Sequence, residues 1–145
     1  MKRRTILLVE DNPQDEMLIL RALRRHNLAN RIDVARDGQQ ALDYLFGEGE
    51  YAGRETADRP AIVLLDIGLP RLSGLEVLAR LRANPLTRLQ PVVMLTSSDE
   101  ERDRLASYEH GANSFVHKPL DFGEFVETVS RLGVYWLATN EPPQG

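Results

Sequence analysis

Five short apolar runs, separated by longer segments with helical periodicity, constrain the fold of this chain more than any other feature. The runs lie at residues 6–9, 32–35, 62–65, 92–95 and 115–116, and most of their residues are β-branched or aliphatic. Continuous rather than alternating apolarity is typical of strands that are covered on both faces. The pattern therefore predicts five buried strands of a parallel sheet.

Each apolar run is followed by a segment that has its own helix start. These starts are Asp11-Asn12-Pro13, Asp37-Gly38, Ser73-Gly74, the capping box Ser98-Asp99-Glu100-Glu101, and Asp121 with Glu124. We expect the third helix to close at Asn84-Pro85, the fourth at Gly111, and the fifth to continue through Leu137. Strict alternation of five strands and five helices predicts an α/β fold, namely a (βα)5 doubly wound, flavodoxin-like parallel sheet with helices on both faces.

A single domain accounts for the whole length of the chain, residues 1–145. The connection at residues 47–60 exceeds the roughly 2 to 6 residues usual in such folds and has no periodicity. We expect an extended surface loop there, with a partner contact through Tyr51 as the alternative.

Charge and composition exclude several classes of protein. The chain has 18 basic and 22 acidic side chains and no cysteine, which excludes disulfide scaffolds and thiolate zinc sites and argues against nucleic-acid binding. No apolar run reaches the roughly 7 to 15 residues of a signal peptide or the roughly 18 of a membrane span. A cytoplasmic protein without membrane contact is expected.

Polar residues stand where the predicted strands end. They are Glu10 and Asp11 after the first strand, Asp66 after the third, Thr96 and Ser97 after the fourth, and Lys118 and Pro119 after the fifth. In open α/β sheets, ligands bind at the carboxyl ends of the strands, so we expect these side chains to converge. Hard oxygen ligands without cysteine or nearby histidine suit Mg²⁺ or Mn²⁺. Carboxylates, a divalent metal, a hydroxyl and a lysine together can neutralise a phosphoryl group on an aspartate.

Each of these residues also has a purely structural interpretation. Glu10 and Asp11 could cap the first helix, Asp66 could be a turn residue, and Thr96 could be a strand residue. Lys118 is harder to explain in this way, because the chain has 16 arginines and only two lysines. A compact ammonium is not equivalent to a planar guanidinium, and four such residues at successive strand ends make coincidence a poor explanation.

The same residues resemble the motif set of bacterial response-regulator receiver domains over about residues 5–138. The motifs are Leu8-Val9-Glu10-Asp11, Leu64-Leu65-Asp66 with Leu69-Pro70 and Gly74, Met94-Leu95-Thr96-Ser97, and Gly111-Ala112 leading to Phe115 and Lys118-Pro119. The resemblance implies that Asp66 is the phospho-acceptor and that Thr96 and Lys118 bind the phosphoryl oxygens. It also implies that Phe115 is an aromatic switch residue coupled to Thr96, and that Lys118-Pro119 is a cis peptide.

The resemblance further implies a metal site and a limited phosphoryl lifetime. Glu10, Asp11, Asp66 and the backbone carbonyl of Gly68 would hold Mg²⁺. Gly68 and Ser98 would flank the approach of the hydrolytic water and so influence how long the phosphoryl group survives. In this family the output is a population shift, without classical enzyme turnover of a separate substrate.

A narrower similarity links the chain to single-domain regulators paired with bacterial phytochrome histidine kinases. It rests on the long 47–60 loop, on Tyr135-Trp136-Leu137, and on the expected lack of an output domain. It implies a phytochrome-type sensor histidine kinase as partner, and relay to a histidine phosphotransfer protein or dimerisation as output. A homodimer would form through the fourth helix, fifth strand, fifth helix and the region of Trp136.

Other functions fit the sequence less well. A flavodoxin-like FMN site needs a phosphate-binding loop where this chain has Glu10 and Asp11. The segment at residues 47–52 matches a dinucleotide-binding spacing but follows a helix and carries acidic residues. An aspartyl-phosphate phosphatase would be expected to have an aspartate at Gly68. The strongest alternative is a pseudo-receiver that binds partners without being phosphorylated.

Overall fold

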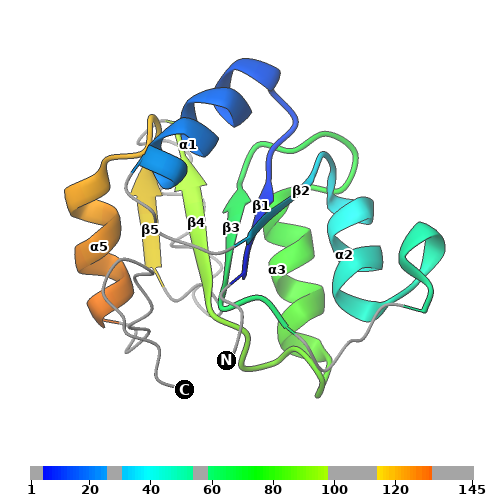
Figure 1. Ribbon diagram of the computed structural model, residues 1–145. Helices are drawn as coiled ribbons and strands as arrows, with labels where there is room; N and C mark the ends of the chain where they lie inside the picture. The colour runs from blue at the N-terminus through cyan, green and yellow to red at the C-terminus, as the bar shows by residue number, and fades with distance from the viewer. Residues whose placement is uncertain (1–4, 26–30, 54–58, 98–113, 132–145) are drawn as a thin grey trace.

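Five parallel strands form one sheet in the order β2-β1-β3-β4-β5 (Figure 1). The strands are β1 Thr5–Val9, β2 Arg31–Ala35, β3 Ile62–Asp66, β4 Val92–Thr96 and β5 Ser114–His117. The computed structural model describes residues 5–25, 31–53, 59–97 and 114–131. All five predicted strands and the flavodoxin-like order are confirmed, with strand ends that extend one residue beyond several of the apolar runs. The order reverses between β1 and β3, so the site is expected at their carboxyl ends.

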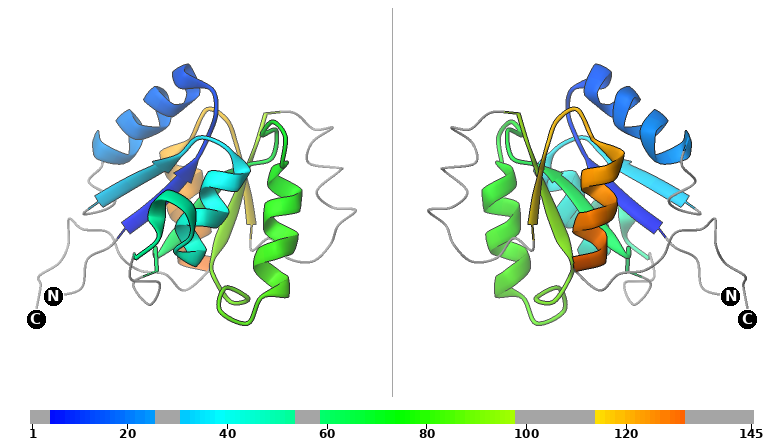
Figure 2. Two further views of the ribbon diagram at one scale, coloured as in Figure 1. Left: turned by 90° about the vertical axis from the view of Figure 1, so that its right-hand side faces the viewer. Right: turned by 90° about the vertical axis from the view of Figure 1, so that its left-hand side faces the viewer.

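Helices cover both faces of this sheet, as predicted. The described helices are α1 Pro13–Arg25, α2 Gly38–Phe46, α3 Gly74–Ala83 and α5 Phe122–Arg131. Figures 1 and 2 show α1 and α5 on one face and α2 and α3 on the other. The predicted fourth helix and the predicted continuation of the fifth helix to Leu137 lie outside the described residues.

Side-chain caps fix the starts of the described helices. The capping residues, each with the residue whose backbone N–H it accepts, are Asp37 with Gln40, Ser73 with Glu76, and Asp121 with Glu124. Before α1, Asn12 Oδ1 accepts the N–H groups of Gln14 and Asp15 at 2.9 and 3.0 Å. These bonds satisfy helix N–H groups that have no partner within the helix. They also fix the path of the chain between each strand end and the next helix.

Two hydrophobic cores lie on opposite faces of the sheet because side chains alternate along each strand. Leu7, Val9 and Met94 belong to the core beneath α2 and α3. Ile6 and Leu8 belong to the core beneath α1 and α5, where Phe125 is fully buried. The central strands are therefore apolar at every position except one polar residue at an end of each, Thr5, Asp66 or Thr96.

The connection after α2 contains a short 3-10 helix, η1 Gly49–Tyr51, that the sequence did not predict. The ring of Tyr51 packs edge-on against Tyr44, with ring centroids 5.3 Å apart. The hydroxyl of Tyr44 donates to Asp33 Oδ2 of β2 at 2.5 Å. Tyr51 thus packs against the core beneath α2. This packing explains an aromatic residue in the loop, and no contact with a partner protein is needed to explain it.

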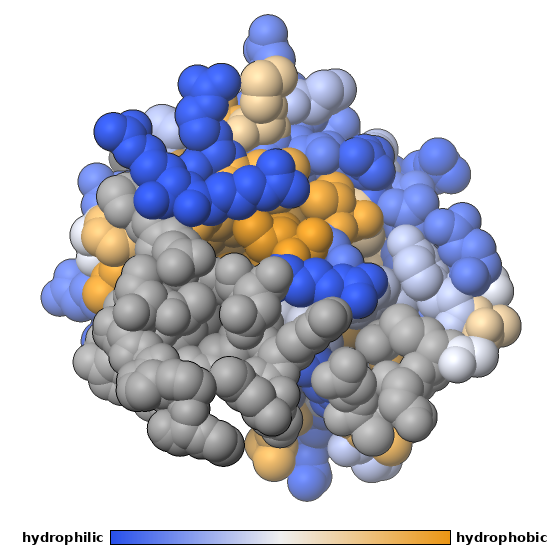
Figure 3. All heavy atoms as spheres, in the orientation of Figure 1, coloured by the Kyte–Doolittle hydropathy of each residue, from blue (hydrophilic) through white to orange (hydrophobic). Residues whose placement is uncertain are grey.

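The outer surface of α1 carries several arginines. Arg21, Arg24 and Arg25 border a surface hollow of about 550 Å³ together with Met17 and Leu20. In the orientation of Figure 1, Figure 3 shows hydrophilic side chains in the region of α1 above an apolar area.

In the part of the chain that the structure describes, no helix is both long and apolar enough to cross a membrane.

Candidate functional site

Strand register brings the predicted acidic residues together at the carboxyl edge of the sheet. β1 and β3 pair in parallel with Val9 opposite Leu65, and one further residue along both strands sets Glu10 beside Asp66. Glu10 is fully buried and Asp66 is 4% exposed, whereas Asp11 is exposed. One carboxylate oxygen from each of the three lies within 4.8 Å of the other two.

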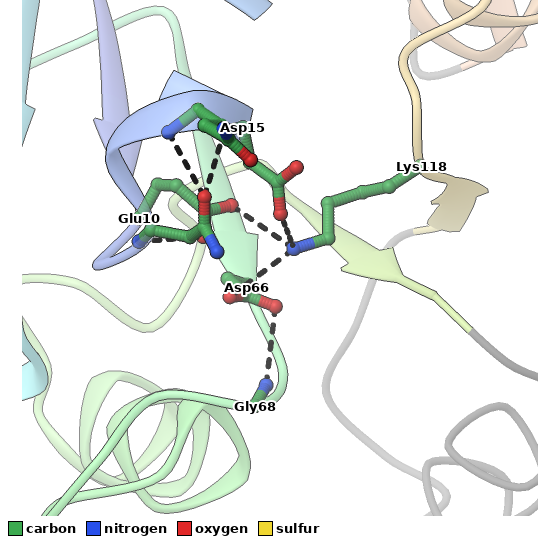
Figure 4. A network of polar contacts seen from close by, with 7 residues as sticks. Glu10, Asp15, Asp66, Gly68 and Lys118 are labelled. Atoms are coloured by element: carbon green, nitrogen blue, oxygen red, sulfur yellow. Dashed lines mark hydrogen bonds and ion pairs between the residues drawn. The ribbon is translucent and has the colours of Figure 1, made fainter. Parts of the chain in front are cut away.

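Lys118 reaches this cluster from the end of β5. Its Nζ lies 2.9 Å from Asp15 Oδ2, 3.2 Å from Glu10 Oε1 and 3.4 Å from Asp66 Oδ2. Figure 4 shows the ammonium between Asp15 and Glu10 on one side and Asp66 on the other. The side chain of Lys118 is only 11% exposed. The predicted lysine therefore contacts two of the predicted carboxylates directly, and Glu10 is 108 residues away in the sequence.

Burial and charge alter the pKa values in this cluster. Burial is the main cause that raises the pKa of Glu10 to about 7, and the neighbouring Asp66 raises it further, against the opposing effect of Lys118. Burial alone would lower the pKa of Lys118. The hydrogen bond to Asp15 and the charges of Asp66 and Glu10 outweigh burial and raise it. Lys118 is therefore charged at neutral pH, while Glu10 gains a proton readily when no metal is present.

Backbone groups hold the two buried carboxylates in place. Asn12 N donates to Glu10 Oε2 at 3.2 Å, and Gly68 N donates to Asp66 Oδ1 at 3.1 Å. The second bond gives Gly68 a role in orienting Asp66 that the sequence did not suggest. Gly68 as a carbonyl ligand of a metal stays a prediction.

Thr96 lies at the end of β4, beside the segment that carries Lys118. Its side chain is fully buried, and Oγ1 has no hydrogen-bond partner within the described part of the chain. Its carbonyl accepts the Lys118 N–H at 2.8 Å. A buried hydroxyl without a partner is costly unless a ligand satisfies it, so Thr96 is suited to bind an incoming oxygen.

Phe115 shares a face of the sheet with Thr96. In the β4–β5 register Met94 is opposite Phe115 and Thr96 is opposite His117. Paired residues of neighbouring strands lie on one face, and so do residues two apart. Phe115 is half-buried and packs against the core beneath α2 and α3. It therefore lies near Thr96, where the switch hypothesis needs it.

The structure thus assembles Glu10, Asp11, Asp66, Thr96 and Lys118 at one edge of the sheet. The Lys118–Pro119 peptide bond is cis, as the resemblance implied. Ser98 lies outside the described residues. Asp15 was missed, because an acidic residue in the first turn of a helix has an ordinary explanation in the helix dipole.

The donor set fits a hard divalent cation. The cluster offers oxygen atoms only, which are the ligands that Mg²⁺ and Mn²⁺ prefer. Two of the three carboxylates are buried with Lys118 as the only cation bonded to them in the contacts described above. A divalent cation would offset the remaining negative charge.

Comparison with known proteins identifies the family. A family model described as the response regulator receiver domain matches residues 6–130. The chain belongs to the response regulator receiver family. It is a signalling protein with the function of a two-component response regulator.

Several relatives resemble this receiver over nearly their whole length. The solved bacteriophytochrome response regulator AtBRR is 52% identical, with a TM-score of 0.89, over 97% of this chain and 100% of that chain. FilR2 of Methanothrix harundinacea, a probable methanogenesis regulatory protein, is 43% identical over 95% of this chain and 86% of its own. The response regulator Rcp1 of Synechocystis is 37% identical over 94% of this chain and 90% of its own. The Mn²⁺-bound form of Rcp1 superimposes with a TM-score of 0.71 at 35% identity, over 97% of this chain and 99% of that chain.

Proposed function

We propose that Asp66 accepts a phosphoryl group from the phosphohistidine of a partner kinase. The observation that carries this proposal is the position of Asp66, a buried carboxylate with the Lys118 ammonium 3.4 Å away in a cluster of potential metal ligands. Thr96, whose hydroxyl has no hydrogen-bond partner among the described residues, ends the neighbouring strand. Phosphoryl transfer needs mainly positioning and charge neutralisation, which these groups supply.

The transfer forms one bond and breaks another. A carboxylate oxygen of Asp66 bonds to phosphorus as the phosphorus–nitrogen bond of the phosphohistidine breaks, and the imidazole nitrogen keeps the electron pair. Glu10, Asp11, Asp66 and the carbonyl of Gly68 would hold Mg²⁺, which neutralises charge on the phosphoryl oxygens. Lys118 and Thr96 would bind two of those oxygens.

Loss of the phosphoryl group would follow by attack of water on phosphorus, with release of phosphate and return of the Asp66 carboxylate. Gly68 places no side chain next to Asp66, so it leaves the approach of water open. Ser98 would act on the same approach from the other side. Self-dephosphorylation of this kind makes the receiver a phospho-acceptor that limits its own signal.

The output proposed here is a shift between two conformations. When the Thr96 hydroxyl binds a phosphoryl oxygen, its movement would free space that Phe115 can fill from the same face of the sheet. A ligand shifts such an equilibrium only by its differential affinity for the two states. The new bond to Thr96 is that differential interaction.

Acetyl phosphate and beryllofluoride test the acceptor assignment. With Mg²⁺ and acetyl phosphate, the wild type should gain the mass of one phosphoryl group, and Asp66→Asn should gain none. Beryllofluoride transfers no phosphoryl group, and its binding should likewise depend on Asp66. Asp43→Asn, a carboxylate exchange on α2 away from the site, should behave as the wild type. An unmodified wild type that nevertheless binds a kinase would instead support the pseudo-receiver alternative.

A phytochrome-type histidine kinase is the partner we propose. One relative favours it: AtBRR is a bacteriophytochrome response regulator, and this receiver is 52% identical to it over nearly the whole of both chains. Transfer from a panel of purified, autophosphorylated kinases measures the preference. The phytochrome kinases should transfer fastest at short incubation times, and a faster transfer from an unrelated kinase would contradict this pairing. A histidine phosphotransfer protein added downstream tests relay.

A homodimer through the fourth helix, β5, α5 and the region of Trp136 is the assembly we propose. Within the described residues, Phe122 at the start of α5 is 37% exposed, which is unusual for a large aromatic side chain. Sedimentation of the wild type should give the dimer mass, and Trp136→Ala should move the mass toward the monomer. Equal masses for both proteins would contradict the assigned interface.

A further inference from the structure

The shortest contact of the Lys118 ammonium is made with a residue outside the predicted site. Asp15 Oδ2 lies 2.9 Å from Nζ, closer than Glu10 at 3.2 Å or Asp66 at 3.4 Å. Asp15 stands in the first turn of α1, and the side chain is 36% exposed. Its N–H is bonded to Asn12 Oδ1, so the same turn that carries Glu10 into α1 also fixes Asp15.

The three carboxylates that contact Lys118, namely Asp15, Glu10 and Asp66, differ in whether they would also bind a metal ion. An ammonium group has three N–H donors. In this structure Lys118 donates to Glu10 and Asp15 and forms an ion pair with Asp66 (Figure 4). Glu10 and Asp66 belong to the potential metal ligands, whereas Asp15 does not. A bound cation would compete with Lys118 for Glu10 and Asp66, and Asp15 would remain as the carboxylate that holds the ammonium.

We infer that Asp15 is a positioning residue for Lys118, which holds the ammonium beside Asp66 while the buried carboxylates bind the metal. The inference rests on the proposed phosphorylation of Asp66. A charge-assisted hydrogen bond at 2.9 Å is short enough to fix the lysine rotamer, and one fixed N–H leaves the others free for phosphoryl oxygens. Small displacements of such groups cost rate steeply.

The neighbouring acid on α1 gives a matched control. Glu16 Oε2 accepts from Arg36 at 2.8 Å and is bonded to a different cation. Glu16→Gln removes one negative charge from the same helical turn without touching Lys118. Any difference between Asp15→Asn and Glu16→Gln therefore reports the lysine contact rather than the net charge.

The first experiment observes the lysine itself in the absence of metal. The chain has only two lysines, Lys2 and Lys118, so lysine-selective isotope labelling gives two side-chain signals in an NMR spectrum. In EDTA, Asp15→Asn should shift the Lys118 signal, Glu16→Gln should not, and Lys2 serves as the internal reference. An unchanged Lys118 signal in Asp15→Asn would overturn the inference.

The second experiment measures phosphorylation by acetyl phosphate at saturating Mg²⁺. Asp15→Asn should slow the modification of Asp66 on the order of tenfold, with Glu16→Gln within about twofold of the wild type. Asp15→Glu keeps the carboxylate and should recover most of the rate. A wild-type rate in Asp15→Asn would show that the contact does not position the lysine for transfer.

A double-mutant cycle separates the contact from a general effect on folding. The free energy of unfolding in EDTA is compared for wild type, Asp15→Asn, Lys118→Met and the double variant, and the two changes should be non-additive. Additive changes would argue against the contact. If the wild type is not phosphorylated at Asp66, the proposed function fails, whereas the NMR and stability measurements still decide whether Asp15 holds Lys118.

Discussion

At two helix starts, Gly38 and Gly74, another backbone segment approaches too closely to leave room for a side chain. A Cβ on Gly74 would lie 2.3 Å from the carbonyl oxygen of Asp66, and a Cβ on Gly38 would lie 2.5 Å from that of Leu72. Both distances are far below van der Waals contact. Gly74 therefore allows α3 to begin directly against the backbone of Asp66, and even one added methyl group would disturb the site.

Gly74→Ala should destabilise the protein by about 1 to 3 kcal/mol, since the added methyl group forces a backbone shift. Gly123→Ala is the control, because α5 leaves room there, with the nearest atom 3.4 Å from the added Cβ. In a helix alanine is favoured over glycine by about 0.5 to 1 kcal/mol. Urea unfolding should give opposite signs for the two variants, and a neutral Gly74→Ala would refute the close approach.

At the scale of elements, one arginine fastens the connection between α3 and β4. Arg82 Nη1 donates to the carbonyls of Arg88 at 2.9 Å and Gln90 at 2.8 Å. Gln90 in turn donates to the carbonyl of Pro60, 3.0 Å away, ahead of β3. These bonds order a turn at the end of the sheet opposite to the site.

Arg82→Met should lower the free energy of unfolding by about 1.5 to 3 kcal/mol, because the carbonyls of Arg88 and Gln90 lose a charged donor while the aliphatic stem is kept. Arg80→Met on the exposed side of α3 is the control and should change stability by less than about 0.5 kcal/mol. Both variants should bind beryllofluoride as the wild type does. Weaker beryllofluoride binding in Arg82→Met, with unchanged binding in Arg80→Met, would show that this turn is coupled to the site.

Local patterns made most elements predictable, because strands, caps and helix starts depend on neighbouring residues. The rule that ligands bind at the carboxyl ends of the strands likewise predicted that Glu10 and Asp66 converge. The contact of Asp15 with Lys118 was not predictable, since it depends on how α1 crosses the sheet. The packing of Tyr51 on Tyr44 was missed for a related reason, because η1 has no periodicity to detect.

At the scale of the whole molecule, the negative charge buried at the site lowers the stability of the folded protein. The ends of β1, β3 and β5 and the first turn of α1 meet there, and burying Glu10 beside Asp66 raises its pKa from 4.5 to about 7. The folded protein therefore binds this proton more tightly than the unfolded chain. Ionising Glu10 costs stability, and the cost grows as pH rises from the unfolded to the folded pKa.

The stability of the metal-free wild type relative to Glu10→Gln should fall between pH 4.5 and pH 7, by at most about 3 kcal/mol. Urea unfolding in EDTA at several pH values measures this difference. Mg²⁺ at pH 8 should stabilise the wild type more than the variant, because the cation binds ionised Glu10 in the folded state. A difference that does not change with pH would contradict the raised pKa.

Strand register also divides the site residues between the two faces of the sheet. Glu10, Asp66 and Lys118 continue the strand positions that point toward α1 and α5, whereas Thr96 and Phe115 continue those that point toward α2 and α3. A fluorescent reporter on α1 would therefore respond to any change of charge at the site, and cation binding without phosphorylation would be enough to change its signal. A reporter near Phe115 would respond to the proposed switch, so a biosensor for that switch should carry its dye on the α2 and α3 side.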